Sequence, residues 1–153
     1  MKLLELKIPP LILLLLAAAA MWLVSSFVPA WRFDFDGRTL AAISLAVAGV
    51  CVTAAGVVSF RRAGTTVNPM KPDDASALVD TGIYRYTRNP MYLGFLLALL
   101  GWGVFLANPA ALVVAPLFVL YMNRFQITPE ERALGQMFGP TFQTYRRRVR
   151  RWL

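Results

Sequence analysis

Two uninterrupted apolar runs, from Leu11 to Ala30 and from Leu40 to Phe60, constrain the fold of this chain most strongly. A helix of about 20 apolar residues matches a hydrocarbon core roughly 30 Å thick. With 58% apolar and 16% charged residues, a soluble domain of this length could not bury so much apolar surface. The first run exceeds the apolar core of a signal peptide, so we expect a retained span. The sequence predicts an all-α, polytopic integral membrane protein.

A third apolar run, from Met91 to Met122, is interrupted by Asn108-Pro109. Proline lacks an amide donor, and the residue before it resists helical backbone angles. We therefore predict two antiparallel helices, Met91–Ala107 and Ala110–Met122, joined by a tight turn. Both are short for a full span and require tilt or local thinning of the bilayer. The prediction is about four transmembrane helices.

The division of the chain follows from these four segments. We expect one membrane domain, residues 1–153, in which residues 1–60 form two N-terminal spans. Residues 61–153 form a cytosol-facing half, with a helical hairpin over 91–122 and then cytoplasmic C-terminal amphipathic helices.

Basic residues are distributed unevenly around the predicted spans. Fourteen of the 16 Lys and Arg residues lie in residues 1–10, 61–90 and 123–153, and only Arg32 and Arg38 lie on the opposite side. Loops rich in Lys and Arg remain cytoplasmic. We expect a prokaryotic plasma (inner) membrane protein with both termini in the cytoplasm. This orientation accounts for the net charge of +8, and no recognised nucleic-acid module supports a nucleic-acid partner.

The chain contains no histidine, and Cys51 is its one cysteine. The missing imidazole removes the usual general base and a common metal ligand. One thiol and few carboxylates argue against a zinc site. We therefore predict no metal centre.

An Arg-Asn-Pro step stands at the predicted cytoplasmic start of the third helix. Pro90 suits the first helical turn and Asn89 suits the N-cap. Capping does not explain why Arg88 and Tyr92 flank the same turn. A helix N-terminus beside a guanidinium can bind a carboxylate or a phosphate.

The segment Thr128-Pro129-Glu130-Glu131 follows the fourth apolar helix. Thr-x-x-Glu with proline after the threonine is typical of a capping box that starts a new helix. This interpretation gives Glu131 a structural role and leaves Glu130 without one.

The remaining C-terminal residues are predicted to form a last helix after a break at Gly139-Pro140. Tyr145 and Arg148 lie three residues apart and share a helical face. The basic run Arg146–Arg151 is typical of a face that lies on the membrane surface. Within that run we single out Arg148, and we expect Arg150 and Arg151 to be surface charges that tolerate substitution.

Several blocks in the C-terminal part of the chain form a specific set in their order and spacing. They are Leu78-Val79-x-Thr81-Gly82-Ile83-Tyr84, Arg88-Asn89-Pro90-x-Tyr92-x-Gly94, Asn108-Pro109, Glu130-Glu131-x-x-Leu134, Phe138-Gly139, Tyr145 and Arg148-Val149. Together they resemble the isoprenylcysteine carboxyl methyltransferase family, and more distantly the phospholipid N-methyltransferases. The resemblance covers about residues 65–153.

The resemblance implies an S-adenosylmethionine-dependent membrane methyltransferase with its cofactor in a helical pocket of the half formed by residues 61–153. Its acceptor would be lipid-borne or lipophilic, reached from the bilayer, and carboxyl O-methylation is favoured. The family usually has His where this chain has Asn89, which can donate hydrogen bonds but cannot become a cation. The motif match implies the cofactor-binding residues Arg88, Asn89, Pro90, Tyr92, Gly94, Glu130, Glu131, Tyr145 and Arg148, with Arg88, Glu130 and Arg148 as catalytic candidates.

Three other interpretations remain open. A phospholipid or small-amine N-methyltransferase is one. A membrane sterol reductase, which binds a nicotinamide cofactor in a similar half, is another, although such enzymes are much longer. The third is a non-catalytic membrane scaffold, which leaves the blocks around Arg88 and Glu130 unexplained.

Overall fold

The computed structural model describes residues 4–65 and 76–153. All regular structure in these two ranges is helical, which confirms the predicted all-α class. Lys2 and Lys71, which contribute to the predicted orientation, lie outside the described residues. The elements are α1 (Pro10–Phe27), the 3-10 helix η2 (Pro29–Trp31), α2 (Arg38–Arg62), the 3-10 helix η4 (Gly82–Arg85), α3 (Pro90–Leu106), α4 (Pro109–Leu112), α5 (Val114–Tyr121), the π-helix η5 (Met122–Ile127) and α6 (Thr128–Arg148).

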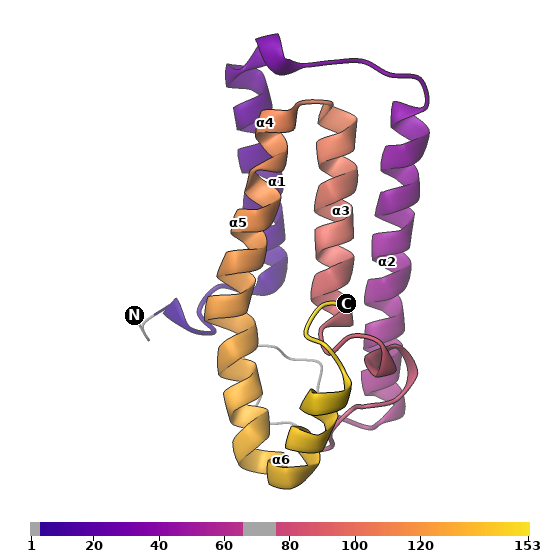
Figure 1. The fold of residues 1–153 in the computed structure, drawn as a ribbon, viewed down its shortest axis with the longest axis vertical. Coiled ribbons are helices and arrows are strands. Elements are labelled where there is room, and N and C mark those ends of the chain that lie inside the picture. The colour runs from indigo at the N-terminus through magenta and orange to yellow at the C-terminus, as the bar shows by residue number, and fades with distance from the viewer. Residues whose placement is uncertain (1–3, 66–75) are drawn as a thin grey trace.

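The apolar helices lie side by side along the long axis of the molecule (Figure 1). By length and composition, α1, α2 and the continuous helical stretch Pro109–Arg148 can each cross a membrane. Large apolar side chains such as Leu15, Leu40 and Leu120 are more than half exposed on the outside of the bundle. An apolar outer surface of this extent suits contact with lipid. The 17-residue α3 is shorter, so its role as a further span remains a prediction.

Small residues bring α2 and α3 into close contact. A Cβ atom added to Gly94 would lie 2.4 Å from the carbonyl oxygen of Gly49, and one added to Gly49 would lie 2.5 Å from the carbonyl oxygen of Gly94. The Thr53 hydroxyl lies in the same contact and donates to the Met91 carbonyl at 3.4 Å. Glycine at these positions allows the helix backbones to touch.

The connection between α3 and α4 is a short turn built around Asn108. Ala107 adopts left-handed backbone angles and ends α3. The Asn108 Oδ1 atom accepts from the Ala110 amide at 3.0 Å, and its Nδ2 donates to the Val28 carbonyl at 2.8 Å. The turn is thereby tied to the end of α1.

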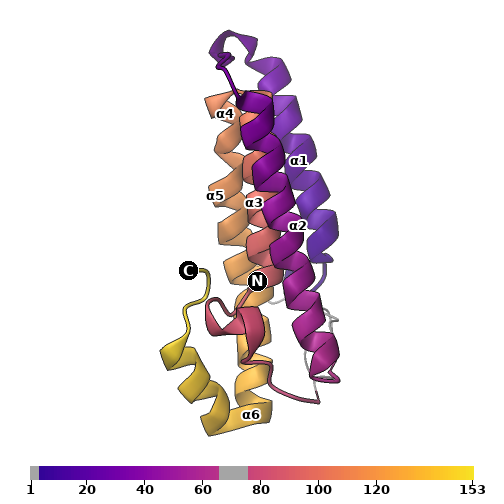
Figure 2. The ribbon, with the colours of Figure 1, turned by 90° about the vertical axis from the view of Figure 1, so that its right-hand side faces the viewer.

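The predicted capping box at Thr128 is wrong. Thr128 has helical backbone angles, no side chain caps α6, and helix continues into it from η5. Because the preceding helix does not end, no free amides remain for Thr128 to cap. Its hydroxyl instead donates backwards to the Asn123 carbonyl at 2.6 Å. The predicted break does occur, because Gly139 has φ 46° and ψ −121°, and the second half of α6 folds back beside the first (Figure 2).

Candidate functional site

The candidate site lies at the end of the bundle where α3 begins. Three chain segments meet there: residues 87–92, the first turn of α6, and residues 149–152, which follow the folded-back half of α6 (Figures 1 and 2). The kink at Gly139 turns the chain so that its last described residues return to the start of α3.

A charged triad occupies the centre of this cluster. The Glu131 carboxylate contacts Arg88 Nη2 at 2.7 Å and Arg151 Nη2 at 2.6 Å. The side chains of Arg88 and Glu131 are each 10% exposed. Charge-assisted hydrogen bonds in such a sheltered place are stronger than neutral ones. The triad carries two positive charges and one negative charge, so it has an excess of one positive charge.

Glu130 has a different environment from its neighbour Glu131. The Tyr92 hydroxyl donates a short hydrogen bond to Glu130 Oε1, and Tyr92 is buried. Among the residues in the described ranges, no Arg or Lys forms an ion pair with Glu130. Of the two adjacent carboxyl groups, Glu130 is therefore the one that forms no ion pair within residues 4–65 and 76–153.

Asn89 stands at the predicted N-cap position of α3, but its side chain makes no capping bond. Its Nδ2 donates to the Arg151 carbonyl at 2.9 Å, and the Thr87 hydroxyl donates to the same oxygen at 3.2 Å. The Arg88 amide donates to the Arg150 carbonyl at 3.0 Å. Three consecutive residues before α3 are thus bonded to the segment after α6.

The Arg88 guanidinium also binds the end of α6. Its Nη1 donates to the Arg146 carbonyl at 3.1 Å and makes a short bond to the Val149 carbonyl. Cations near a helix C-terminus satisfy its free carbonyls and favour its dipole. Arg88 Nε is buried and has no partner among the described residues.

The π-helix contributes Asn123, which sequence reasoning missed. Its Oδ1 accepts from Trp152 Nε1 at 3.0 Å and from Arg151 Nη1 at 3.3 Å. Single-turn π segments inside α-helices are frequent at functional sites. The expectation that Arg151 is a free surface charge is wrong, because two of its nitrogens bind Glu131. Trp152, directly after the basic run, was the one signal in the sequence that this end of the chain returns to the core.

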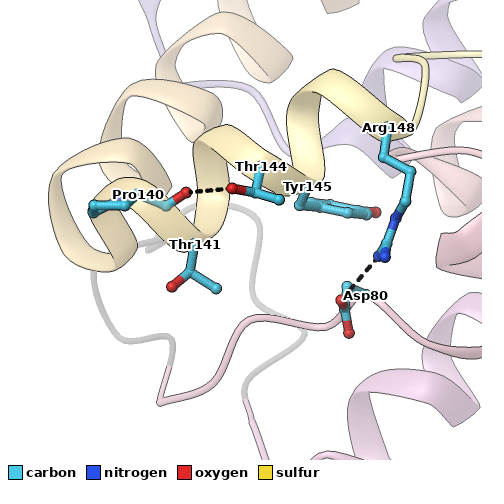
Figure 3. Close-up of a pocket in the computed structure, with 6 residues that line it drawn as sticks. All are labelled: Asp80, Pro140, Thr141, Thr144, Tyr145 and Arg148. Carbon is cyan, nitrogen blue, oxygen red and sulfur yellow. Dashed lines mark hydrogen bonds and ion pairs between the residues drawn. The ribbon is translucent and has the colours of Figure 1, made fainter.

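Tyr145 and Arg148 lie on another side of α6, at an open cavity of about 350 Å³. Figure 3 shows Arg148 directed at Asp80, and their closest charged atoms are 3.1 Å apart. The Tyr145 hydroxyl donates to the Tyr84 carbonyl at 2.8 Å. Burial raises the pKa of the Tyr84 hydroxyl well above its usual range, so it stays protonated. The structure therefore pairs Arg148 with Asp80 and not with the triad.

Pro90 and Gly94 take part in helix packing. Both are buried; Pro90 lies beside Gly56 of α2, and Gly94 faces Gly49 and Thr53. The resemblance implies nine cofactor-binding residues, and the structure brings five of them into one cluster: Arg88, Asn89, Tyr92, Glu130 and Glu131. The other four lie in the helix packing or beside the cavity at Tyr145.

The sequence profile described as phospholipid methyltransferase matches residues 38–141. The chain belongs to this family. Relatives whose names specify protein-S-isoprenylcysteine O-methyltransferases match most of the chain, which confirms the resemblance seen in the sequence. The probable enzyme of Oryza sativa subsp. japonica is 32% identical over 122 residues, 78% of this chain and 60% of the relative. The enzyme of Schizosaccharomyces pombe is 30% identical over 121 residues, 77% of this chain and 50% of the relative.

A shorter relative matches part of the chain at higher identity. An uncharacterized protein of Haemophilus influenzae is 44% identical over 63 residues, which make up 41% of this chain and the whole of the relative. The chain spans about half to three fifths of the length of the rice and yeast enzymes. No solved structure matches the chain.

Proposed function

We propose that this protein is an S-adenosylmethionine-dependent methyltransferase that methylates a carboxyl group on a lipid-borne or lipophilic acceptor, as isoprenylcysteine methyltransferases do. The observation that carries the proposal is the meeting of two sequence blocks at one end of the bundle. Tyr92 contacts Glu130, and Arg88 contacts Glu131, across 38 and 43 residues of chain. The names of the relatives support the reaction class.

The charges of the cluster fit S-adenosylmethionine. This cofactor carries a sulfonium, an ammonium and a carboxylate. Glu130 offers a carboxyl group that pairs with no Arg or Lys of the described part of the chain, and the neighbouring Tyr92 ring offers an aromatic face to a cation. The excess positive charge of the triad suits a carboxylate. The buried Nε of Arg88, which has no hydrogen-bond partner in the part of the chain that the structure describes, is a further donor in the same place.

The reaction asks little acid–base chemistry of the protein. When bound, S-adenosylmethionine supplies an electrophilic methyl group, and a carboxylate acceptor is already ionised near neutral pH. The protein therefore needs no general base, in agreement with a chain that has no histidine. The work left to Arg88, Tyr92 and Glu130 is to hold and align the reactants and to exclude water.

The place of the cluster fits a membrane acceptor. We propose that the α3–α5 hairpin spans the membrane together with α1 and α2, that the cluster faces the cytoplasm of a prokaryotic cell, and that residues 61–153 form the cofactor-binding half. A water-soluble cofactor then reaches the cluster from the cytosol, and the acceptor reaches it from the bilayer.

A second candidate is phospholipid or small-amine N-methylation, which the description of the family profile favours. An amine must lose its proton before it attacks the methyl group. The rate of an N-methyltransferase therefore rises with pH below the pKa of the amine, whereas a carboxylate acceptor needs no such rise.

Two measurements test the proposal on protein purified in detergent. Calorimetry should show binding of S-adenosylmethionine and S-adenosylhomocysteine, and none of NADPH, which serves as the control for a reductase. With methyl-labelled cofactor, label should enter the lipid fraction and leave as volatile methanol after alkaline treatment. Label that stays in lipid after base supports N-methylation. Absence of both cofactor binding and methyl transfer would contradict the proposed methyltransferase function. It would then favour the interpretation of the protein as a non-catalytic membrane scaffold.

A further inference from the structure

Arg151 has an environment unlike that of its neighbours in the basic run. The side chains of Arg146, Arg147 and Arg150 are exposed, whereas that of Arg151 is 30% exposed. Its Nε and Nη2 bind Glu131 at 3.1 and 2.6 Å, and its Nη1 binds Asn123 at 3.3 Å. All three kinds of guanidinium nitrogen therefore have a partner inside the protein.

We propose that Arg151 is a positioning residue of the cofactor site, and that the segment Val149–Trp152, here called the C-terminal strap, closes this site over the start of α3. The inference rests on the proposed methyltransferase function and adds a residue that the sequence motifs do not contain. Arg151 acts through Glu131 and Arg88 and need not touch the cofactor itself.

The backbone of the strap is the first support for this role. Successive carbonyls of Val149, Arg150 and Arg151 accept hydrogen bonds from residues 87–89. The indole of Trp152 packs against the core cluster that contains Tyr92, Met122 and Ile127. The strap thus joins the start of α3 to the π-helix, and Arg151 and Trp152 are its side-chain anchors on Asn123.

The charge balance is the second support. Both oxygens of Glu131 are bound by guanidinium groups, Oε1 by Arg88 and Arg151 and Oε2 by Arg151. Glu131 is therefore occupied by the protein, and Glu130 is the carboxylate left for a cationic group of the cofactor. Loss of Arg151 removes the excess positive charge of the triad. It also leaves Glu131 with one ion pair, to Arg88, where the unmodified protein has two.

The test measures the Kd of S-adenosylhomocysteine by calorimetry, which requires no turnover. Because a hydrogen bond to a charged group is worth roughly a factor of ten or more, Arg151→Gln should weaken binding about tenfold. Arg151→Lys should recover part of this loss, since it restores the charge but not the planar fork. The matched control Arg147→Gln removes an exposed charge and should leave the Kd within about twofold.

A stability control separates positioning from general weakening of the fold. Asn108→Ala removes buried hydrogen bonds at the opposite end of the bundle and should lower Tm without changing the Kd. In a Glu131→Gln background, Arg151→Gln should cost little further affinity, because the ion pair with Glu131 through which Arg151 acts on the site is already lost, although its bond to Asn123 remains.

The outcomes distinguish the two proposals. Failure of the unmodified protein to bind contradicts the proposed function and this inference with it. Binding by the unmodified protein with an unchanged Kd in Arg151→Gln overturns this inference alone. The same holds if Asn108→Ala weakens binding as much as Arg151→Gln at an equal loss of Tm, or if the losses from Glu131→Gln and Arg151→Gln are fully additive.

Discussion

The Tyr92 hydroxyl on α3 donates a hydrogen bond to the Glu130 carboxylate on α6, and this contact joins two residues that are 38 positions apart in the chain. The neighbouring Glu131 makes its contacts with guanidinium groups instead. The two adjacent carboxyl groups therefore have different surroundings: Glu130 accepts a hydrogen bond from a phenol, and Glu131 is fixed in an ion-pair network. We propose that Glu130 is the one that receives a cationic group of the cofactor.

The first prediction separates these two carboxylates. Glu130→Gln keeps an oxygen that can accept from Tyr92, so Tm should change little while the affinity for S-adenosylmethionine falls about tenfold or more. Glu131→Gln also breaks one buried ion pair, with Arg88, and one partly buried ion pair, with Arg151, and should destabilise the fold by about 2–3 kcal/mol. Thermal unfolding and calorimetry on both variants test this. Unchanged affinity in Glu130→Gln would remove that residue from the site.

The second prediction concerns the two arginines that the resemblance implies for catalysis. The two terminal nitrogens of the Arg88 guanidinium bind Glu131 and the carbonyls of Arg146 and Val149 at the same time. A single lysine ammonium cannot reach all three, so in Arg88→Lys both the cofactor affinity and the Tm should fall. Arg148→Lys should have a small effect, because Arg148 is 62% exposed and paired with Asp80, and exposed pairs contribute about 0–1 kcal/mol. A large loss of binding in Arg148→Lys would place the cofactor at the cavity beside Tyr145.

The parts of the fold that the sequence predicted correctly depend on local signals. The apolar runs before Phe60 predicted α1 and α2 because length and hydrophobicity alone decide a span. Asn108-Pro109 predicted the turn after α3 because proline cannot continue a helix. Gly139-Pro140 predicted the kink in α6 for the same reason.

The predictions at Thr128 and at Arg151 failed, for different reasons. A capping box and a continuing helix look alike in the sequence at Thr128. This failure is local: the π-helix η5 runs directly into α6, and the Thr128 hydroxyl donates to the Asn123 carbonyl five residues earlier. Arg151 looks like its neighbours in the basic run, and only the kink at Gly139 brings it to Glu131. The sequence therefore identified the residues of two motif blocks but not the strap that holds them.

The third prediction concerns topology. Asp36→Cys in a Cys51→Ala background should react with a membrane-impermeant thiol reagent from outside the cell, because the loop between α1 and α2 lies on the side poor in basic residues. Gln136→Cys in the same background is the matched control and should react only from the cytoplasmic side. Labelling of position 36 from the cytoplasm alone would reverse the predicted orientation.

The fourth prediction is a pH dependence at the N-terminal segment. Hydrogen bonds from Arg124 and Arg132 hold the pKa of Glu5 below its usual range. A carboxylate whose pKa is lower in the folded state adds stability above its unfolded pKa, and this stability is lost as pH falls through the folded value. The Tm difference between the unmodified protein and Glu5→Gln should therefore be present at neutral pH and vanish in acid. A difference that does not change with pH would show that the ion pairs do not stabilise the fold.

The last prediction concerns the contact between α2 and α3, which fixes where α3 begins and therefore where Arg88 and Tyr92 lie. In Gly94→Ala the new methyl group would lie 2.4 Å from the Gly49 carbonyl oxygen and 3.0 Å from the Thr53 amide, so the helices must separate. Overpacking of this kind costs about 1–3 kcal/mol. Gly135→Ala in α6 is the matched control, because its new methyl group meets nothing closer than 3.8 Å, and it should be neutral or stabilise the helix by up to about 1 kcal/mol. Thermal unfolding of the two variants should give Tm shifts of opposite sign or clearly unequal size, and cofactor affinity should fall only in Gly94→Ala. Equal Tm values would mean that α2 and α3 do not pack backbone to backbone at Gly94.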